Sequence, residues 1–309
     1  MHMIEREAVN YDWVVIDECH GLFSEASFAD DAEYIASWIR SRRAQEAMTA
    51  ARPFATKMLE MVNDFTHEVL SLPQPQDAPE SWASRFFVNR TADPNKIGLL
   101  VITGDKGLAG SFNAVVLRAA MRFIKEHAHQ EIFVLAVGKK GRDFLARLKM
   151  PNLHIVYESV GIFPKVSYAH AELLGDGVMK TFLQENLHSV TLIYNDFKSL
   201  ASQNLVQKVL LPFVPSGAEV TDVHEFEFEP GLVDIFKLMV PRLIKANMYR
   251  VLLESQAANL AATTSAMDAA SKNAGEIVSA LGLKLNKVRQ AGITNEILDI
   301  VNGAEALNN

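Results

Sequence analysis

The C-terminal stretch of the chain constrains the fold more than any other part. From Val240 to Ala306 there is no proline after Pro241 and almost no pattern typical of a strand. An unbroken helix over this stretch would be on the order of 100 Å long at about 1.5 Å per residue, several times the width of a small domain. The sequence therefore predicts a long helix that needs a partner along its length.

Apolar and small residues recur along this predicted helix at the three- and four-residue intervals of a coiled-coil seam. They are Met267, Ala270, Ala274, Ile277, Leu281, Leu285 and Val288. Five charged residues exclude a membrane-spanning helix: Lys272, Glu276, Lys284, Lys287 and Arg289. Gly275, Gly282 and Gly292 each cost roughly 1 kcal/mol of helix propensity, which close approach to another protein surface would have to offset. The alternative is a bundle of shorter helices broken at these glycines.

The middle of the chain, from about Phe86 to Val223, alternates between short β-branched runs and helical segments. The runs are "IGLLVIT", "IFVLAV", "LHIVYE" and "SVTLIYN". Strands that alternate with helices of this size predict a parallel α/β sheet covered on both faces.

The turn after the first of these strands, "TGDKGLAGSFN", contains Gly104, Gly107 and Gly110. Its spacing is G-x-x-G-x-x-G, whereas the dinucleotide fingerprint is G-x-G-x-x-G. We therefore expect the glycines to serve a tight strand-to-helix turn, with Ser111 or Asn113 capping the helix, and no cofactor.

Near the N-terminus, "VVIDECHG" is similar to the strand of DExH-box helicases, in which an Asp binds Mg²⁺ and a Glu orients the attacking water. Asp17 and Glu18 occupy these positions, but ATP hydrolysis also requires a glycine-rich phosphate loop. Only sixteen residues precede Asp17, and none is glycine. The single Gly-Lys pair, Gly138-Lys139, lacks the other loop residues. We expect Asp17 and Glu18 to perform no chemistry.

Four parts are predicted from the changes in composition. Residues 1–40 form an atypical helicase-like segment, and 41–72 form an amphipathic helix with a possible kink at Pro53. A proline-rich loop opens the third part, the α/β domain of residues 73–230, and the long helix occupies 231–309.

Overall charge and cysteine content limit the class of protein. The net charge of −7 argues against a strongly basic nucleic-acid-binding surface. Cys19 is the only cysteine, so no intrachain disulfide can form. The histidines are scattered, and the nearest pair, His127 and His129, would point to different faces of a helix, so no metal site is expected. The first residues match neither a secretory signal nor a transit peptide.

The segment "NKVRQAGITNEILDIVNGAEAL", Asn286 to Leu307, resembles the C-terminal motif of the F-type ATP synthase gamma subunit. The matching residues are Ile293, Thr294, Glu296, Asp299, Gly303, Ala304 and Ala306. Similarity to the family continues upstream to about Arg42. The resemblance implies a Rossmann-like domain that binds no nucleotide and an antiparallel coiled coil of the N- and C-terminal helices.

The resemblance also implies a function: the central-stalk rotor, which couples proton-driven rotation to ATP synthesis on the beta subunits. Such a subunit catalyses nothing and holds no cofactor. Its expected partners are the alpha, beta and epsilon (delta-type) subunits and the membrane c-ring, with no nucleic acid and no direct membrane insertion. The expected location is peripheral, at the cytoplasmic face of the bacterial plasma membrane. Arg289 and Gln290 occupy the position that contacts a beta-subunit loop, and Lys287 is a weaker candidate.

Before Arg42 the sequence departs from the gamma pattern, and only "RRAQ" of the expected N-terminal helix is present. A segment from about Tyr11 to Arg40 that resembles a helicase fragment stands there instead. Two alternatives to a working rotor therefore stay open: a chimeric or truncated gamma chain that cannot assemble, and a fragment of a DExH-box ATPase.

Overall fold

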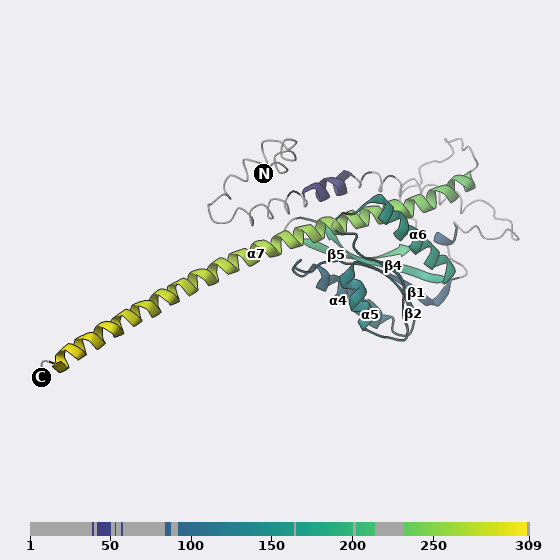
Figure 1. Ribbon diagram of the computed structural model, residues 1–309. Coiled ribbons are helices and arrows are strands. Elements are labelled where there is room, and N and C mark those ends of the chain that lie inside the picture. The colour runs from purple at the N-terminus through teal and green to yellow at the C-terminus, as the bar shows by residue number, and fades with distance from the viewer. Residues whose placement is uncertain are drawn as a thin grey trace. The chain divides into compact units, whose positions relative to one another are not determined.

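A computed structural model describes most of the chain from residue 84 onward and a few helical residues before it (Figure 1). The described residues are 39, 42–50, 53, 57, 84–87, 92–163, 165–199, 202–213 and 232–307. Asp17, Glu18, Cys19 and the proline-rich loop predicted after residue 70 lie outside them. The chain divides into two compact units, Met1–Thr264 and Ser265–Asn309.

The first unit is built around a five-stranded sheet with the order β3-β2-β1-β4-β5. Its strands are β1 (Asp93–Ile102), β2 (Glu131–Val137), β3 (Leu153–Ser159), β4 (Leu187–Phe197) and β5 (Gln203–Leu211). The first four run parallel, and β5 pairs antiparallel with β4. The four predicted strands and their parallel arrangement are confirmed, whereas β5 was not predicted.

Helices cover both faces of this sheet, as predicted. The helical elements are η1 (Ser84–Phe86), α4 (Phe112–Glu126), α5 (Lys139–Arg147), α6 (Tyr168–Gln184) and α7 (Leu232–Leu307). Successive residues of a strand point to opposite faces. Leu99 and Val101 of β1 accordingly pack in the cluster formed by α4 and α5, and Leu100 and Ile102 pack in the cluster formed by α6 and α7. We call the sheet with α4, α5 and α6 the α/β domain.

The glycine-rich turn after β1 lies against α7. A Cβ atom on Gly104 would lie 2.5 Å from Nδ2 of Asn259, so a side chain at this position would force the Asn259 side chain to move. The Gly104 N–H donates to Oδ1 of Asn113 at 2.8 Å. Ser111 is the N-cap residue of α4 by position, but its side chain makes no cap hydrogen bond. The tight-turn prediction is confirmed; the predicted side-chain cap is wrong, because Asn113 binds the turn and Ser111 binds no helix N–H.

The long C-terminal helix is confirmed as one element: α7 spans 76 residues, with Pro241 inside it. Gly275, Gly282 and Gly292 do not break it, so the alternative of several shorter helices is wrong. A Cβ atom added at any of these glycines would meet no heavy atom within 4 Å. The close approach that the sequence led us to expect at these glycines is therefore not made within the described part of the chain.

Residues 42–50 form a helical segment that packs on α7. Ala44 and Met48, one helical turn apart, are buried in a cluster with Leu253 and Ala257 of α7, which are also one turn apart. Each helix thus contributes one face to a small apolar contact.

Candidate subunit interface

The three predicted contact residues lie on the part of α7 that belongs to the second unit. Lys287, Arg289 and Gln290 are all exposed. Successive helical residues are about 100° apart around the axis, so Arg289 and Gln290 project in adjacent directions. Lys287, two residues before Arg289, projects from nearly the opposite side. Gln290 is three residues after Lys287, so these two are only about 60° apart around the helix, whereas Arg289 is about 100° from Gln290 and about 160° from Lys287.

The residues of the C-terminal motif are also exposed as far as their side chains are described. Ile293, Thr294, Glu296 and Asp299 all face solvent, and the Thr294 hydroxyl donates to the carbonyl oxygen of Gln290 at 2.9 Å. Gly303 and Ala304 belong to α7 as well.

An exposed apolar stripe, here called the proximal stripe, runs along α7 before these residues. Its large members are Met267, Ile277, Leu281, Leu285 and Val288. They follow the predicted three- and four-residue spacing. A contiguous exposed apolar surface of this kind is typical of a site that binds another protein.

The proximal stripe is no longer apolar after Val288. The positions that continue it at helical spacing are Gly292, Glu296 and Asp299, which are small or acidic. Apolar side chains reappear on other sides of the helix. Ile293, Ile297 and Ile300 form what we call the distal stripe, and the exposed Val301 and Leu298 lie further round the helix beside it. At 3.6 residues per turn, the twelve residues from Leu281 to Ile293 make about three and one third turns, so the stripes are about 120° apart.

The carboxyl ends of the parallel strands are where a doubly wound sheet usually binds a ligand. Here Asp105 occupies that edge. Its Oδ1 accepts hydrogen bonds from the backbone N–H groups of Lys139, at the start of α5, and Gly161, both at 2.9 Å. Its Oδ2 accepts one from the N–H of Phe163 at 3.1 Å. A carboxylate of the chain itself thus accepts the N–H group at the start of α5, where an anion could otherwise bind. No local pattern in the sequence marks Asp105 for this role.

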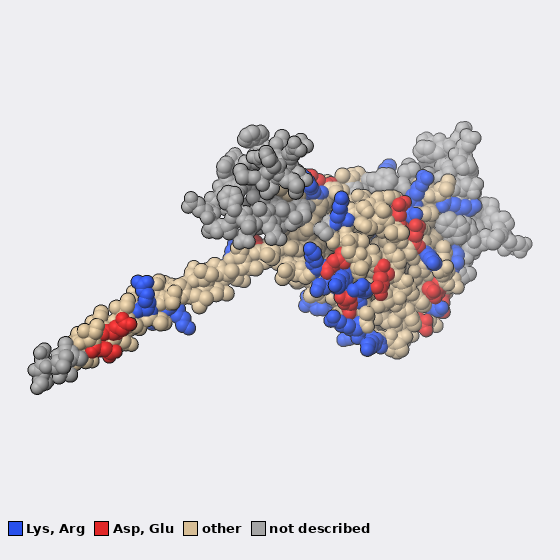
Figure 2. Space-filling view, in the orientation of Figure 1, with Lys and Arg blue, Asp and Glu red and all other residues tan. Residues whose placement is uncertain are grey.

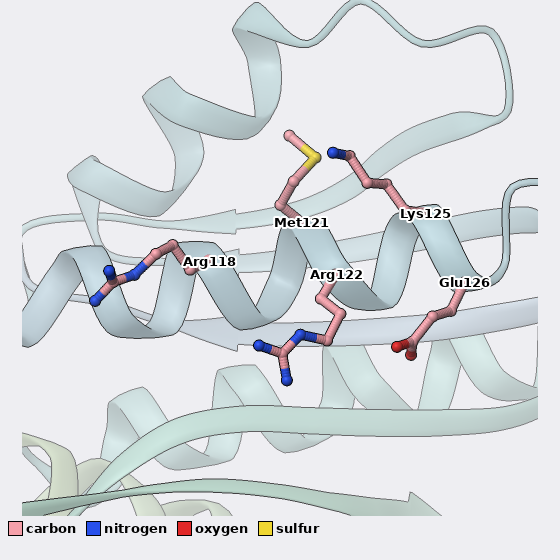
Figure 3. Close-up of a pocket in the computed structure, with 5 residues that line it drawn as sticks. All are labelled: Arg118, Met121, Arg122, Lys125 and Glu126. Carbon is pink, nitrogen blue, oxygen red and sulfur yellow. The ribbon is translucent and has the colours of Figure 1, made fainter.

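A shallow depression on α4 is lined by Arg118, Met121, Arg122, Lys125 and Glu126 (Figure 3). The labelled side chains project outward from one helix, and none of them is a nucleophile paired with a base. Together α4 and α5 carry seven basic and two acidic residues, although the whole chain is acidic. Figure 2 shows Lys and Arg gathered over this side of the α/β domain.

The described residues contain neither a metal site nor a membrane-spanning helix. Within ranges 84–87, 92–213 and 232–307, less the few gaps given above, no group of His, Cys, Asp and Glu has the geometry to hold a metal ion. Over the same part of the chain, no helix combines the length and hydropathy needed to cross a bilayer.

Comparison with known proteins gives one consistent family. The family model described as ATP synthase matches residues 31–307, a match that begins upstream of Arg42. An ATP synthase gamma chain of Elusimicrobium minutum is 51% identical over 274 residues, covering 87% of this chain and 90% of that protein. An ATP synthase gamma chain of Solibacter usitatus is 36% identical, with 86% and 88% covered.

A solved structure shares the fold at lower sequence similarity. It is a chain of the Euglena gracilis mitochondrial ATP synthase in a cryo-EM structure of its OSCP, F1 and c-ring parts. The TM-score is 0.52 at 15% identity, and the alignment covers 89% of this chain and 95% of that one.

Proposed function

Because the chain belongs to the family of ATP synthase gamma chains, we propose that it is the central-stalk rotor subunit of an F-type ATP synthase. In this role it couples proton-driven rotation to ATP synthesis on the beta subunits. The observation that carries the proposal is the 51% identity to a gamma chain over nearly the full length of both proteins.

The surface of α7 suits such a role. A rotor must present different surfaces to its neighbours in different orientations, so that each orientation favours a different conformation of each neighbour. The proximal stripe, the acidic positions that continue it and the distal stripe give the second unit unlike sides. The exposed apolar residues of both stripes would be buried by the surrounding alpha and beta subunits.

Arg289 and Gln290 are proposed to contact a beta-subunit loop during rotation. A guanidinium donates paired hydrogen bonds to a carboxylate, and an amide both donates and accepts. The two side chains project about 100° apart, so a loop that contacts both must curve around α7. Lys287 lies about 60° from Gln290 and nearly opposite Arg289, so it would share a contact with Gln290 rather than with Arg289.

The chain itself is proposed to be non-catalytic and to bind no nucleotide or other cofactor. Asp105 supports this part of the proposal, because its carboxylate already accepts three hydrogen bonds at the sheet edge where a nucleotide phosphate would bind. Catalysis would then take place on the beta subunits.

We also propose that the α/β domain is Rossmann-like and that the N- and C-terminal helices form an antiparallel coiled coil. The buried contact of Ala44 and Met48 with Leu253 and Ala257 supports the pairing of helices. The proposed domains are the helicase-like segment of residues 1–40, the N-terminal helix of 41–72, the α/β domain of 73–230 and the long helix of 231–309.

The proposed partners are the alpha, beta and epsilon (delta-type) subunits and the membrane c-ring, with no nucleic acid and no segment inserted in the membrane. The complex would lie at the cytoplasmic face of a bacterial plasma membrane. We also propose that the segment from about Tyr11 to Arg40 is similar to a helicase fragment. Asp17 and Glu18 would have no catalytic role in it.

Co-purification tests the proposal. The full chain should be recovered in a complex with the alpha and beta subunits of its own synthase, and that complex should hydrolyse ATP with rotation of this chain. A chain that folds but is not retained by alpha and beta would instead identify the non-assembling chimera. ATP hydrolysis by the chain alone, abolished by Asp17→Asn with Glu18→Gln, would identify the helicase-like alternative.

A further inference from the structure

A charged group is buried between α7 and the sheet. The side chain of Glu254 on α7 is only 2% exposed. The hydroxyl of Tyr194 on β4 donates to its Oε2 at 2.8 Å, and Nη1 of Arg250, one turn earlier on α7, donates to its Oε1 at 3.0 Å. Nη2 of Arg250 also donates to Oδ1 of Asn247 at 3.1 Å. We call this the Tyr194–Glu254–Arg250 network.

Stability alone does not require a charge at this position. A buried carboxylate loses its hydration, and replacing a buried ion pair by apolar side chains of similar volume often leaves a protein equally or more stable. The adjacent residues Val251, Leu252 and Leu253 are buried and apolar already. Burial and the charge of Glu254 raise the pKa of Tyr194, so its hydroxyl keeps the proton that it donates.

The apolar contacts of α7 with the sheet repeat from one helical turn to the next. Buried residues Val240, Ile244 and Met248 recur at intervals of four along the face toward the sheet. Because apolar contacts are non-directional, a slip of one turn would put one apolar side chain where another had been. The same slip would separate Glu254 from Tyr194 and leave a buried carboxylate without its β4 donor, which is costly.

We infer that the Tyr194–Glu254–Arg250 network fixes the register and rotational setting of α7 on the sheet, so that torque passes between the helix and the α/β domain without slip. The inference rests on the proposed rotor function. Glu254 acts as a positioning residue: it touches no reacting group, and it acts through Tyr194 on β4.

The test uses the full chain assembled with the alpha and beta subunits of its own synthase. Variant Tyr194→Phe/Arg250→Met/Glu254→Met replaces all three members of the network with apolar side chains, so no largely buried cation is left without its carboxylate. We expect the Tm of the variant to stay within about 4 °C of wild type. Unloaded ATP hydrolysis should be unchanged, but the stall torque, measured through a bead on the α/β domain, should fall by on the order of half, because α7 now slips under load.

Two further variants separate this role from general stabilisation. Glu254→Gln keeps the size and one acceptor oxygen and should give an intermediate stall torque. Asp176→Asn removes an ion pair that joins α7 to α6, Lys245 to Asp176 at 3.0 Å, in which Asp176 is 57% exposed. A solvent-exposed pair contributes little, so this control should keep the wild-type stall torque.

The outcomes are distinct. Wild-type stall torque in Tyr194→Phe/Arg250→Met/Glu254→Met overturns the inference, as does a loss of torque that only follows a loss of Tm. A wild-type complex that does not rotate at all refutes the proposed function, and the inference with it.

Discussion

Leu108, in the turn after β1, adopts a backbone conformation that is unusual for leucine. Its φ is 61°, in the left-handed region, and its side chain is 79% exposed. Left-handed backbone costs a residue with a Cβ atom roughly 1–2 kcal/mol, and an exposed side chain returns little by burial. Leucine at position 108 therefore does not stabilise the folded chain.

We expect Leu108→Gly to leave the free energy of unfolding unchanged or to raise it by about 1 kcal/mol, because glycine adopts a positive φ without strain. Urea denaturation of the purified chain measures this. Leu173→Gly is the matched control: Leu173 is also exposed, at 63%, but lies within α6, where glycine should cost roughly 1 kcal/mol. Equal losses in the two variants would contradict the argument.

At the scale of elements, the second unit and the sheet differ in what holds them together. Strand β2 has buried neighbours on both faces and pairs with β1 and β3. The described residues of α7 from Ser271 to Asn302 are exposed throughout. An isolated helix without tertiary packing is only marginally stable in water.

Hydrogen exchange should therefore separate these elements. In the isolated chain we expect amides from Ile277 to Val301 to exchange quickly, while those of Ile132 to Val137 in β2 stay protected. Assembly with alpha and beta subunits should slow exchange in the first region. Equal protection of both regions in the isolated chain would show that α7 has a stabilising partner within this chain.

Elements were predictable from the sequence where one local pattern decides the outcome. Strands β1, β2, β3 and β4 are short β-branched runs, and α7 is a long stretch without a strand pattern. Strand β5 was missed because it is an edge strand whose residues alternate between exposed and partly buried, including Gln203, Gln207 and Lys208.

Contacts between distant residues could not be predicted in this way. Tyr194 and Glu254 are 60 positions apart, and Asp105 binds N–H groups 34 to 58 positions away. Nothing local in the sequence marks these pairs, since each depends on how strands and helices pack in three dimensions. The expected functional residues of α7 were found through a family motif, and periodicity alone identified only the proximal stripe.

At the scale of the whole molecule, the assignment of contacts on α7 can be tested in the assembled synthase. We expect Arg289→Ala to lower the rate of ATP synthesis by on the order of tenfold, the effect of losing one charge-assisted hydrogen bond. Lys287→Ala removes a cation from nearly the opposite side of the same helix and should have a smaller effect. Synthesis rates in membrane vesicles, normalised to the amount of assembled complex, measure both. A larger loss in Lys287→Ala would reverse the assignment.

The offset between the proximal and distal stripes has a consequence for timing. The two stripes occupy different heights on α7 and are about a third of a turn apart. When the helix turns, a fixed neighbouring surface at the height of Leu281 contacts the proximal stripe at one point of the cycle. A fixed surface directly above it, at the height of Ile293, contacts the distal stripe about a third of a cycle earlier or later. One rotating helix thus makes its proximal and distal apolar contacts with a constant difference in phase. In a ring of three equivalent neighbours, that difference would let adjacent neighbours sense the apolar surface simultaneously, one at each height.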